Sequence, residues 1–196
     1  TALAVKQVDS AIGKLYEQVK NIGLPVNFIL VSDHGMTKID TENPIGLPNE
    51  IDSAKFIIPR GAELLMLYAK NKKDIKKTYK KLKSIQKDFT VYRPKNMPSI
   101  LHFSKKDDWH HHIGDLLLVP KWPKTFSMGS KELSPGAHGY NPYLVKDMHA
   151  IFYAWGPAFK NNLSIPSFEN VNVYPVITSI LGLTIQGPID GSLKVA

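Results

Sequence analysis

The sequence contains no cysteine among its 196 residues. Disulfide bonds, thiolate metal ligands and a cysteine nucleophile are therefore all excluded. It also has no apolar run that reaches the roughly 18 residues of a membrane-spanning helix, so we expect no membrane span in this chain. No signal peptide is recognisable and the first residue is Thr1, so we expect the chain to start inside a longer precursor.

Hydrophobic residues make up 43% of the sequence, which is ordinary for a globular domain with its own core. The formal net charge is +8, and much of the excess comes from lysines in residues 70–87. Apolar residues recur at helical spacing inside this stretch, so it is predicted to be an amphipathic helix with a lysine-rich outer face. Because the stretch has no arginine and one aromatic residue, we expect a solvated face rather than a nucleic-acid-binding module.

The order of predicted elements favours an α/β fold. Apolar side chains at steps of three and four residues predict a helix over 2–21, which Gly23 and Pro25 end. The nearly unbroken apolar run 26–31 is typical of a strand buried on both faces of a parallel sheet. In such sheets, functional sites lie at the carboxyl ends of strands.

The rest of the chain is predicted from similar patterns. Residues 41–49 and 120–142 are rich in proline and glycine and predict loops, the second long enough to be functional or disordered. The passage 63–93 reads strand–helix–strand and predicts a small βαβ subdomain. Strands are predicted at 56–58, 64–68, 89–92, 100–103, 114–119 and 150–155, and a helix at 173–181.

The strand 26–31 leads directly into Ser32-Asp33-His34-Gly35-Met36. A carboxylate and a neutral imidazole are both good zinc ligands, and a glycine lets the backbone turn sharply behind them. The same residue types also form ordinary turns after strands. The spacing alone therefore leaves a metal site and a plain turn equally open.

Two further groups of histidines stand out. His138 lies in the long loop between glycines, where the backbone can approach a ligand closely, and it is a candidate second metal ligand. Adjacent side chains of an extended segment point to opposite faces, so the triplet 110–112 would chelate one ion poorly, and we interpret it as surface histidines. Asp147 and His149 are interpreted as supporting residues, and His102 as a packing residue.

Several motifs, in order along the chain, resemble the nucleotide pyrophosphatase/phosphodiesterase family of type I phosphodiesterases, in the alkaline phosphatase superfamily. They include Ser32-Asp33-His34-Gly35-Met36, Gly136-Ala137-His138-Gly139-Tyr140-Asn141, Asp147-Met148-His149-Ala150-Ile151-Phe152 and Gly156-Pro157-Ala158-Phe159. The resemblance implies an α/β fold with an alkaline-phosphatase-like, mostly parallel sheet flanked by helices and a small inserted α+β segment. It also implies that residues 1–196 are the carboxyl-terminal part of a phosphodiesterase catalytic domain, and hence a partial domain.

The chemistry implied by the resemblance is that of a two-zinc hydrolase. It would cleave phosphodiester or pyrophosphate bonds of a nucleotide or another small molecule, through a threonine that attacks phosphorus and a water that completes hydrolysis. By motif matching, Asp33 and His34 would hold the zinc that activates the threonine, and His138 would hold the zinc that activates water. Such an enzyme is expected to be extracytoplasmic, either periplasmic or secreted.

We identify no counterpart of the family's threonine motif, of its first metal aspartate or of its Asp-x-x-x-His metal pair in this sequence. The nucleophile is therefore expected upstream, in an amino-terminal half of the catalytic domain, and the isolated chain is expected to be inactive. The alternative interpretation is a catalytically inactive fragment or binding domain that keeps vestigial metal ligands.

Overall fold

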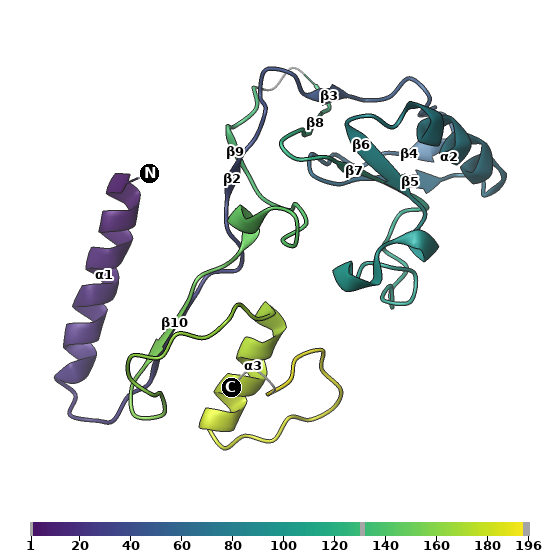
Figure 1. Cartoon of the computed structure of the whole chain (residues 1–196). Helices are drawn as coiled ribbons and strands as arrows, with labels where there is room; N and C mark the ends of the chain where they lie inside the picture. Colours follow the sequence, from purple (N-terminus) through teal and green to yellow (C-terminus); the bar gives the residue numbers. More distant parts are fainter. Residues whose placement is uncertain (1, 130–131, 194–196) are drawn as a thin grey trace. The chain divides into compact units, whose positions relative to one another are not determined.

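A computed structural model describes residues 2–129 and 132–193 of the chain (Figure 1). It divides into two compact units. The first unit comprises the residues up to Asp33 together with those from Ala150 onward, and the second comprises His34–His149. Among the described residues, no helix has both the length and the apolar character needed to cross a membrane.

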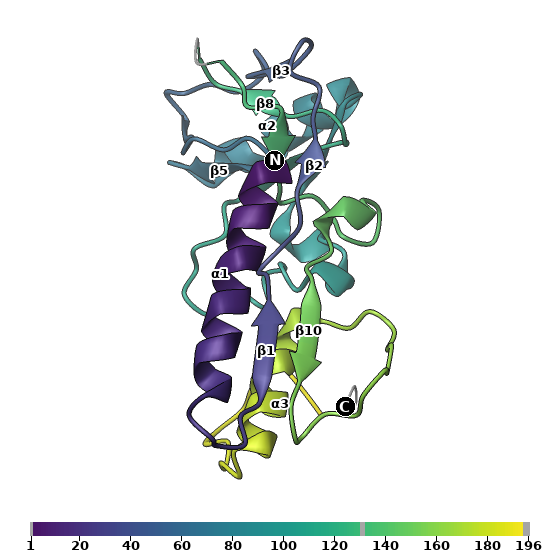
Figure 2. The same ribbon diagram turned by 90° about the vertical axis from the view of Figure 1, so that its left-hand side faces the viewer.

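The first unit is built on a two-stranded antiparallel ribbon. Its strands are β1 (Phe28–Val31) and β10 (Phe152–Trp155), and Figure 2 shows them side by side with opposite directions. Helix α1 (Ala2–Lys20) contacts the ribbon through Tyr16, whose ring lies 5.2 Å from that of Phe28. Phe28 in turn stacks on Trp155 at 5.0 Å. Aromatic pairs at such distances stabilise a structure by more than the burial of their surface area alone. This cluster therefore holds α1 against the ribbon.

The helix predicted near the carboxyl end is also present. Helix α3 spans Val173–Ile180 and follows the short 3-10 helix η4 (Asn170–Asn172). Pro175 lies in the first turn, where its missing N–H is tolerated. Gly182 follows the helix with φ of +65°, a conformation that favours glycine, and so ends it.

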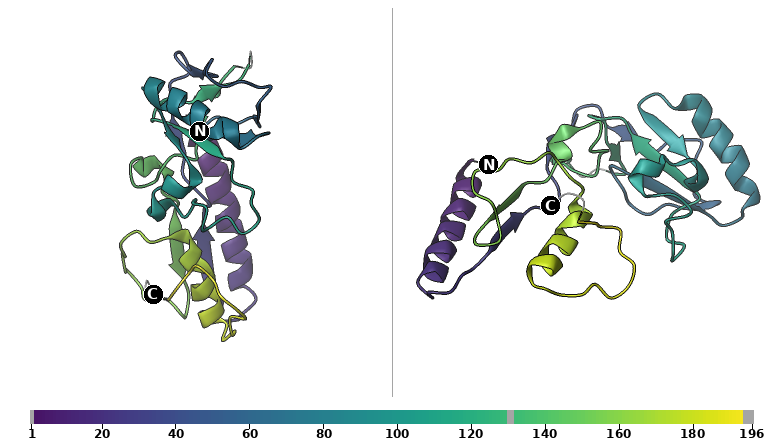
Figure 3. Two further views of the ribbon diagram at one scale, coloured as in Figure 1. Left: turned by 90° about the vertical axis from the view of Figure 1, so that its right-hand side faces the viewer. Right: turned by 60° about the horizontal axis from the view of Figure 1, so that its bottom comes forward.

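The second unit contains a four-stranded sheet in which every neighbouring pair is antiparallel. Helix α2 (Lys73–Ile85) follows the second strand of the sheet and buries Ile75, Thr78 and Leu82, and Figure 3 shows it along one face. The strand order is β4 (Phe56–Ile57), β5 (Leu65–Ala69), β7 (Leu116–Pro120) and β6 (Phe89–Tyr92).

The core of the second unit lies between α2 and this sheet. Strand β6 shows the period-two pattern of a half-buried strand, because Phe89 and Val91 are buried while Thr90 and Tyr92 are partly exposed. The charged residues of α2 lie outside this core, on the face that the lysine pattern predicted. The buried core residues are Ile51, Phe56, Leu65, Leu67, Ile75, Leu82, Phe89, Val91, Leu116, Leu118 and Phe126.

Two very short ladders complete the second unit. Strand β2 (Thr37–Lys38) pairs antiparallel with β9 (Gly136–Ala137), and β3 (Ile45–Gly46) pairs parallel with β8 (Phe126–Ser127). Strands β3, β8 and β9 lie in the segments 41–49 and 120–142 that the sequence predicted as loops, and only β2 lies outside them. The remaining short elements are the 3-10 helices η1 (Pro94–Asn96), η2 (Ser99–Leu101) and η3 (Lys146–Met148).

The expected mostly parallel sheet is wrong for the described residues, whose strands form small and mostly antiparallel sheets. An unbroken apolar run predicts a buried strand, but it does not set the direction of the neighbouring strand. For β1 that neighbour is β10, which lies far away in sequence and runs in the opposite direction.

The strand predicted at 100–103 is also wrong. Those residues fall at the end of η2 and in the left-handed turn at His102, where φ is 46°. The subdomain boundaries at residues 63 and 93 remain a prediction. Residues 130 and 131 of the loop predicted at 120–142 lie outside the described residues.

Candidate functional site

The ladder between β2 and β9 brings two of the predicted site residues together. Thr37 pairs with Ala137, and Lys38 pairs with Gly136. Because the strands are antiparallel, the residues before β2 and those after β9 lie at the same end of the ladder. His34 and His138 occupy these positions, and their rings stack with centroids 3.7 Å apart and planes 10° from parallel.

Two stacked imidazoles are too close and too parallel to share one metal ion. A metal–nitrogen bond is about 2.0–2.1 Å long and the ring centroid lies about 1.1 Å behind the nitrogen, so each centroid lies about 3.2 Å from the ion. When the two metal–nitrogen bonds are at right angles, the centroids are about 4.5 Å apart. The 3.7 Å separation is shorter than this minimum. Each lone pair lies in the plane of its own ring, and the two planes are separate and nearly parallel, so the lone pairs cannot meet at one ion and the arrangement suits one ion for each ring.

The tautomer of His34 is set by its own backbone. Its Nδ1 lies 2.8 Å from the carbonyl oxygen of Gly35, and a carbonyl oxygen accepts, so Nδ1 carries the proton and donates. Nε2 is then the nitrogen with the lone pair, as in metal sites where an outer hydrogen bond fixes the ligand. The ring is half-buried, whereas that of His138 is exposed.

Gly35 is required here by a close approach between two backbone segments. Its N–H donates to the carbonyl oxygen of Met148 at 3.0 Å. A β-carbon at Gly35 would collide with the carbonyl oxygen of Asp147 and would lie 2.8 Å from that of His149. Its φ is not in the left-handed region, so the tight packing, rather than an unusual turn, excludes a side chain.

A buried hydroxyl holds β2 in place beside this contact. Thr37 is 3% exposed, donates to Oδ2 of Asp147 at 2.9 Å and accepts from the indole N–H of Trp122 at 3.1 Å. His149 donates from Nε2 to the carbonyl oxygen of Pro142 at 3.2 Å. Asp147 and His149 thus make local hydrogen bonds, and their supporting role in the site stays a prediction. Nothing in the sequence pattern pointed to Trp122.

The segment that carries His138 is anchored through Tyr140. This side chain is 6% exposed, and its hydroxyl donates to the carbonyl oxygen of Lys124 at 2.9 Å. Burial and the nearby carboxylate of Glu63 raise the pKa of Tyr140 to about 12. Gly139 has φ of +103°, and a β-carbon there would lie 3.4 Å from Cβ of Glu63. The sequence motif contains Tyr140 and Gly139, but it carries no signal for Glu63.

Asp33 belongs to the first unit, where Asn170 binds its backbone. The side-chain amide of Asn170 donates to the carbonyl oxygens of Ser32 at 3.3 Å and of Asp33 at 3.4 Å. Within residues 2–129 and 132–193, no three His, Cys, Asp or Glu side chains are grouped closely enough to hold a metal ion. The candidate metal ligands that the structure brings together are the imidazoles of His34 and His138, and imidazole nitrogen is a suitable ligand for zinc.

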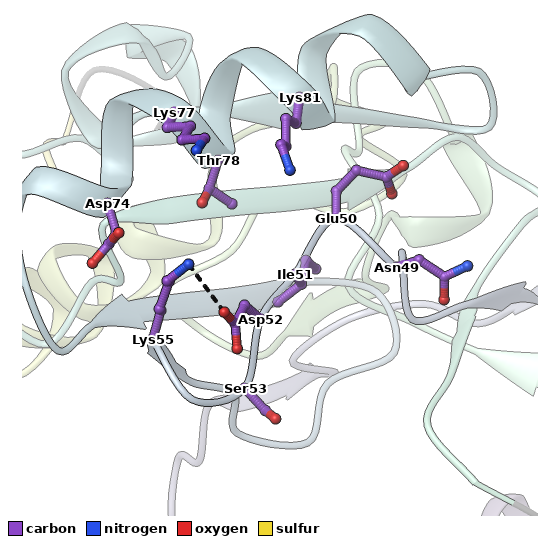
Figure 4. Close-up of a pocket in the computed structure, with 10 residues that line it drawn as sticks. All are labelled: Asn49, Glu50, Ile51, Asp52, Ser53, Lys55, Asp74, Lys77, Thr78 and Lys81. Carbon is purple, nitrogen blue, oxygen red and sulfur yellow. Dashed lines mark ion pairs between the residues drawn. The ribbon is translucent and has the colours of Figure 1, made fainter.

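A separate hollow of about 460 Å³ lies between α2 and the segment 49–55 (Figure 4). Lys77 and Lys81 project into it from α2, and on the opposite side Lys55 pairs with Asp52 of the same segment at 3.1 Å. Acidic and basic side chains line it in equal number, so it has no strong preference for ligands of one charge. It contains none of the predicted metal ligands, and we assign it no part in the candidate site.

Comparisons with known proteins agree with the motifs. Residues 1–141 match the family described as type I phosphodiesterase / nucleotide pyrophosphatase. The bis(5'-adenosyl)-triphosphatase of Bos taurus is 30% identical over 181 residues, which cover 91% of this chain and 38% of that protein. Ectonucleotide pyrophosphatase/phosphodiesterase family member 1 of Mus musculus is 29% identical over 208 residues, which cover 96% of this chain and 22% of that protein.

Solved structures show the same relationship. Human ectonucleotide pyrophosphatase / phosphodiesterase 5 superposes with a TM-score of 0.84 at 26% identity, over 96% of this chain and 50% of that one. An inactive variant of the murine protein in complex with AMP gives the same TM-score, identity and coverage. The chain thus spans about half the length of these solved relatives, and less of the curated ones. Because the family match covers well over half of its residues, the chain belongs to the type I phosphodiesterase/nucleotide pyrophosphatase family.

Proposed function

We propose that the chain contributes part of the centre of a metal-dependent phosphodiesterase or nucleotide pyrophosphatase. In this proposal Asp33 and His34 serve one zinc ion and His138 serves a second. The observation that carries the proposal is the stack of His34 on His138 at 3.7 Å, a separation that suits two ions rather than one. The threonine nucleophile and the remaining ligands lie outside these 196 residues.

The bound metals would supply Lewis-acid stabilisation of the phosphoryl oxygens and a water of lowered pKa. The residues of this chain orient the centre. The Nδ1 hydrogen bond of His34 presents Nε2 as the ligand atom, and Tyr140 and strand β9 fix the backbone on either side of His138. Rigid support of this kind lowers the entropic cost of assembling a site.

The substrate in this proposal is a nucleotide or another small phosphodiester. Family membership and the relative solved with AMP support this choice. The names of several relatives describe ectoenzymes, which supports an extracytoplasmic location for the whole protein. The chain alone is expected not to hydrolyse a nitrophenyl phosphodiester, and robust turnover by it would place the nucleophile within these residues.

The test is a substitution of His138 by alanine in the longer polypeptide that carries the threonine motif. We expect turnover to fall by more than the roughly 10–100-fold that removal of an outer-shell group costs, together with a loss of bound zinc. His102→Asn is the matched control, because His102 is exposed with φ of 46°, which asparagine tolerates. Unchanged turnover and zinc content in His138→Ala would remove His138 from the mechanism.

A further inference from the structure

The histidine triplet contains a second imidazole pair, on the surface of the second unit. The rings of His110 and His112 have centroids 5.7 Å apart and planes 33° from parallel, and both side chains are exposed. We propose that these two side chains form a binding site for one divalent late transition-metal ion, separate from His34 and His138. The proposal does not depend on the function proposed above.

The distance between the two rings fits a shared ion. With the ion about 3.2 Å from each centroid, two rings are about 4.5 Å apart when they bind at right angles and about 6.4 Å apart when they bind on opposite sides of the ion. The observed 5.7 Å lies between these limits, whereas the 3.7 Å between His34 and His138 does not. Since both side chains are exposed, rotation about their side-chain bonds is enough to aim the lone pairs at one point.

The backbone between the two rings is already arranged for chelation. The side-chain alternation of an extended strand does not apply to this triplet, because its middle residue is not extended. His111 itself has φ of 54°, a left-handed conformation that non-glycine residues adopt rarely. The chain therefore turns at His111 and keeps the two flanking rings together.

Neighbouring side chains hold this turn. The carboxylate of Asp108 accepts the N–H groups of His112 at 2.7 Å and of Ile113 at 3.1 Å. The hydroxyl of Tyr68, in β5, donates to the carbonyl oxygen of His112 at 2.7 Å. Because these hydrogen bonds already hold the backbone, binding of an ion loses little of the conformational entropy that ordering a loop usually costs.

The ligand chemistry selects the class of ion. Two neutral imidazoles suit Zn²⁺, Ni²⁺ and Cu²⁺, with Cu²⁺ bound most tightly, and they do not suit Mg²⁺ or Ca²⁺. No third His, Asp or Glu of the described residues groups with the pair, so water completes the coordination shell. The site is accordingly open, and its ion should exchange with solvent.

The test uses the 196-residue chain with His34→Ala and His138→Ala, so that the other imidazole pair cannot contribute. Titration calorimetry with Cu²⁺ and then Zn²⁺ should show one ion bound per chain, with Cu²⁺ the tighter. Adding His110→Ala and His112→Ala together should abolish this binding. His111→Asn is the matched control, because it removes an imidazole while asparagine keeps the left-handed backbone, and it should leave the stoichiometry unchanged.

Two results would overturn the proposal. One is retention of the ion by the chain that lacks both His110 and His112; the other is an equal loss in His111→Asn. A second measurement uses the unsubstituted chain: substoichiometric Cu²⁺ should broaden the ring NMR signals of His110 and His112 before that of His111. Equal broadening of all three rings would contradict a specific pair. These readouts leave the His34–His138 proposal unaffected.

Discussion

Substitution of Gly35 by alanine tests the packing beneath the candidate site. The added β-carbon would meet backbone atoms rather than a flexible side chain, because the carbonyl oxygen of His149 lies 2.8 Å from it and the carbonyl carbon of Asp147 lies 2.9 Å from it. The segment 147–149 must therefore move away. That movement would also stretch the 3.0 Å hydrogen bond from the N–H of Gly35 to Met148.

The size of the effect follows from three contributions. Overpacking in a tight site costs about 1–3 kcal/mol. Loss of the hydrogen bond to Met148 adds about 0.5–1.5 kcal/mol. Alanine recovers about 0.4–1 kcal/mol by restricting the unfolded chain. The free energy of unfolding of Gly35→Ala should thus fall by about 2 kcal/mol, within a range of roughly 0.5–4.

The assay is urea unfolding followed by tryptophan fluorescence, with the mid-point and slope compared between variants. Gly46→Ala is the matched control in the same unit, because nothing lies within 4 Å of a β-carbon built there. It should raise the free energy of unfolding by about 0.4–1 kcal/mol. A loss below about 0.5 kcal/mol in Gly35→Ala, or an equal loss in both variants, would refute the close-approach argument.

Two further predictions concern titration. Lys124 lies 2.7 Å from Asp40, and this ion pair, with backbone N–H donors such as that of Asn43, lowers the pKa of Asp40 to about 2. Its contribution is present above pH 3.8 and is lost as pH falls toward 2, so the stability difference between the unsubstituted chain and Asp40→Asn should vanish over that range in acid unfolding. Tyr140, with pKa raised to about 12, contributes stability below pH 10 that is lost as pH rises through 12, and its phenol should ionise last in an ultraviolet titration. Tyr140→Phe should abolish that late transition and cost about 1 kcal/mol; a late transition that persists would assign it to another tyrosine.

Local elements could be predicted where buried residues recur at a fixed spacing. Strand β6 spans the predicted residues 89–92, because Phe89 and Val91 alternate with less buried neighbours. Helix α2 lies within the predicted lysine-rich stretch, because Ile75 and Leu82 face the core two turns apart. In both elements the spacing of apolar residues indicates which side chains are buried, and that spacing depends only on the residues of the element itself.

Tertiary pairing could not be predicted in the same way. Helix α1 has the apolar repeat of a buried face, yet none of its residues is buried against the described parts of the chain. The apolar run of β1 likewise predicted a strand but not its antiparallel partner. A hydrophobic pattern states that a surface is made to be covered, and it carries no information about which segment covers it or in which direction that segment runs.

The two imidazole pairs show the same limit at the level of chemistry. The sequence identified His34 and His138 as candidate ligands by residue type, but their 3.7 Å stack depends on a two-residue ladder of Thr37-Lys38 with Gly136-Ala137. The triplet seemed poor by the same kind of argument, and a left-handed turn at His111 changes that geometry. The residue types of candidate ligands can therefore be predicted from sequence. Whether two rings can bind one ion or two depends on the distance between them, which the backbone sets and the sequence does not show. Metal stoichiometry, measured separately for each pair, is the quantity that tests the structural part of both proposals.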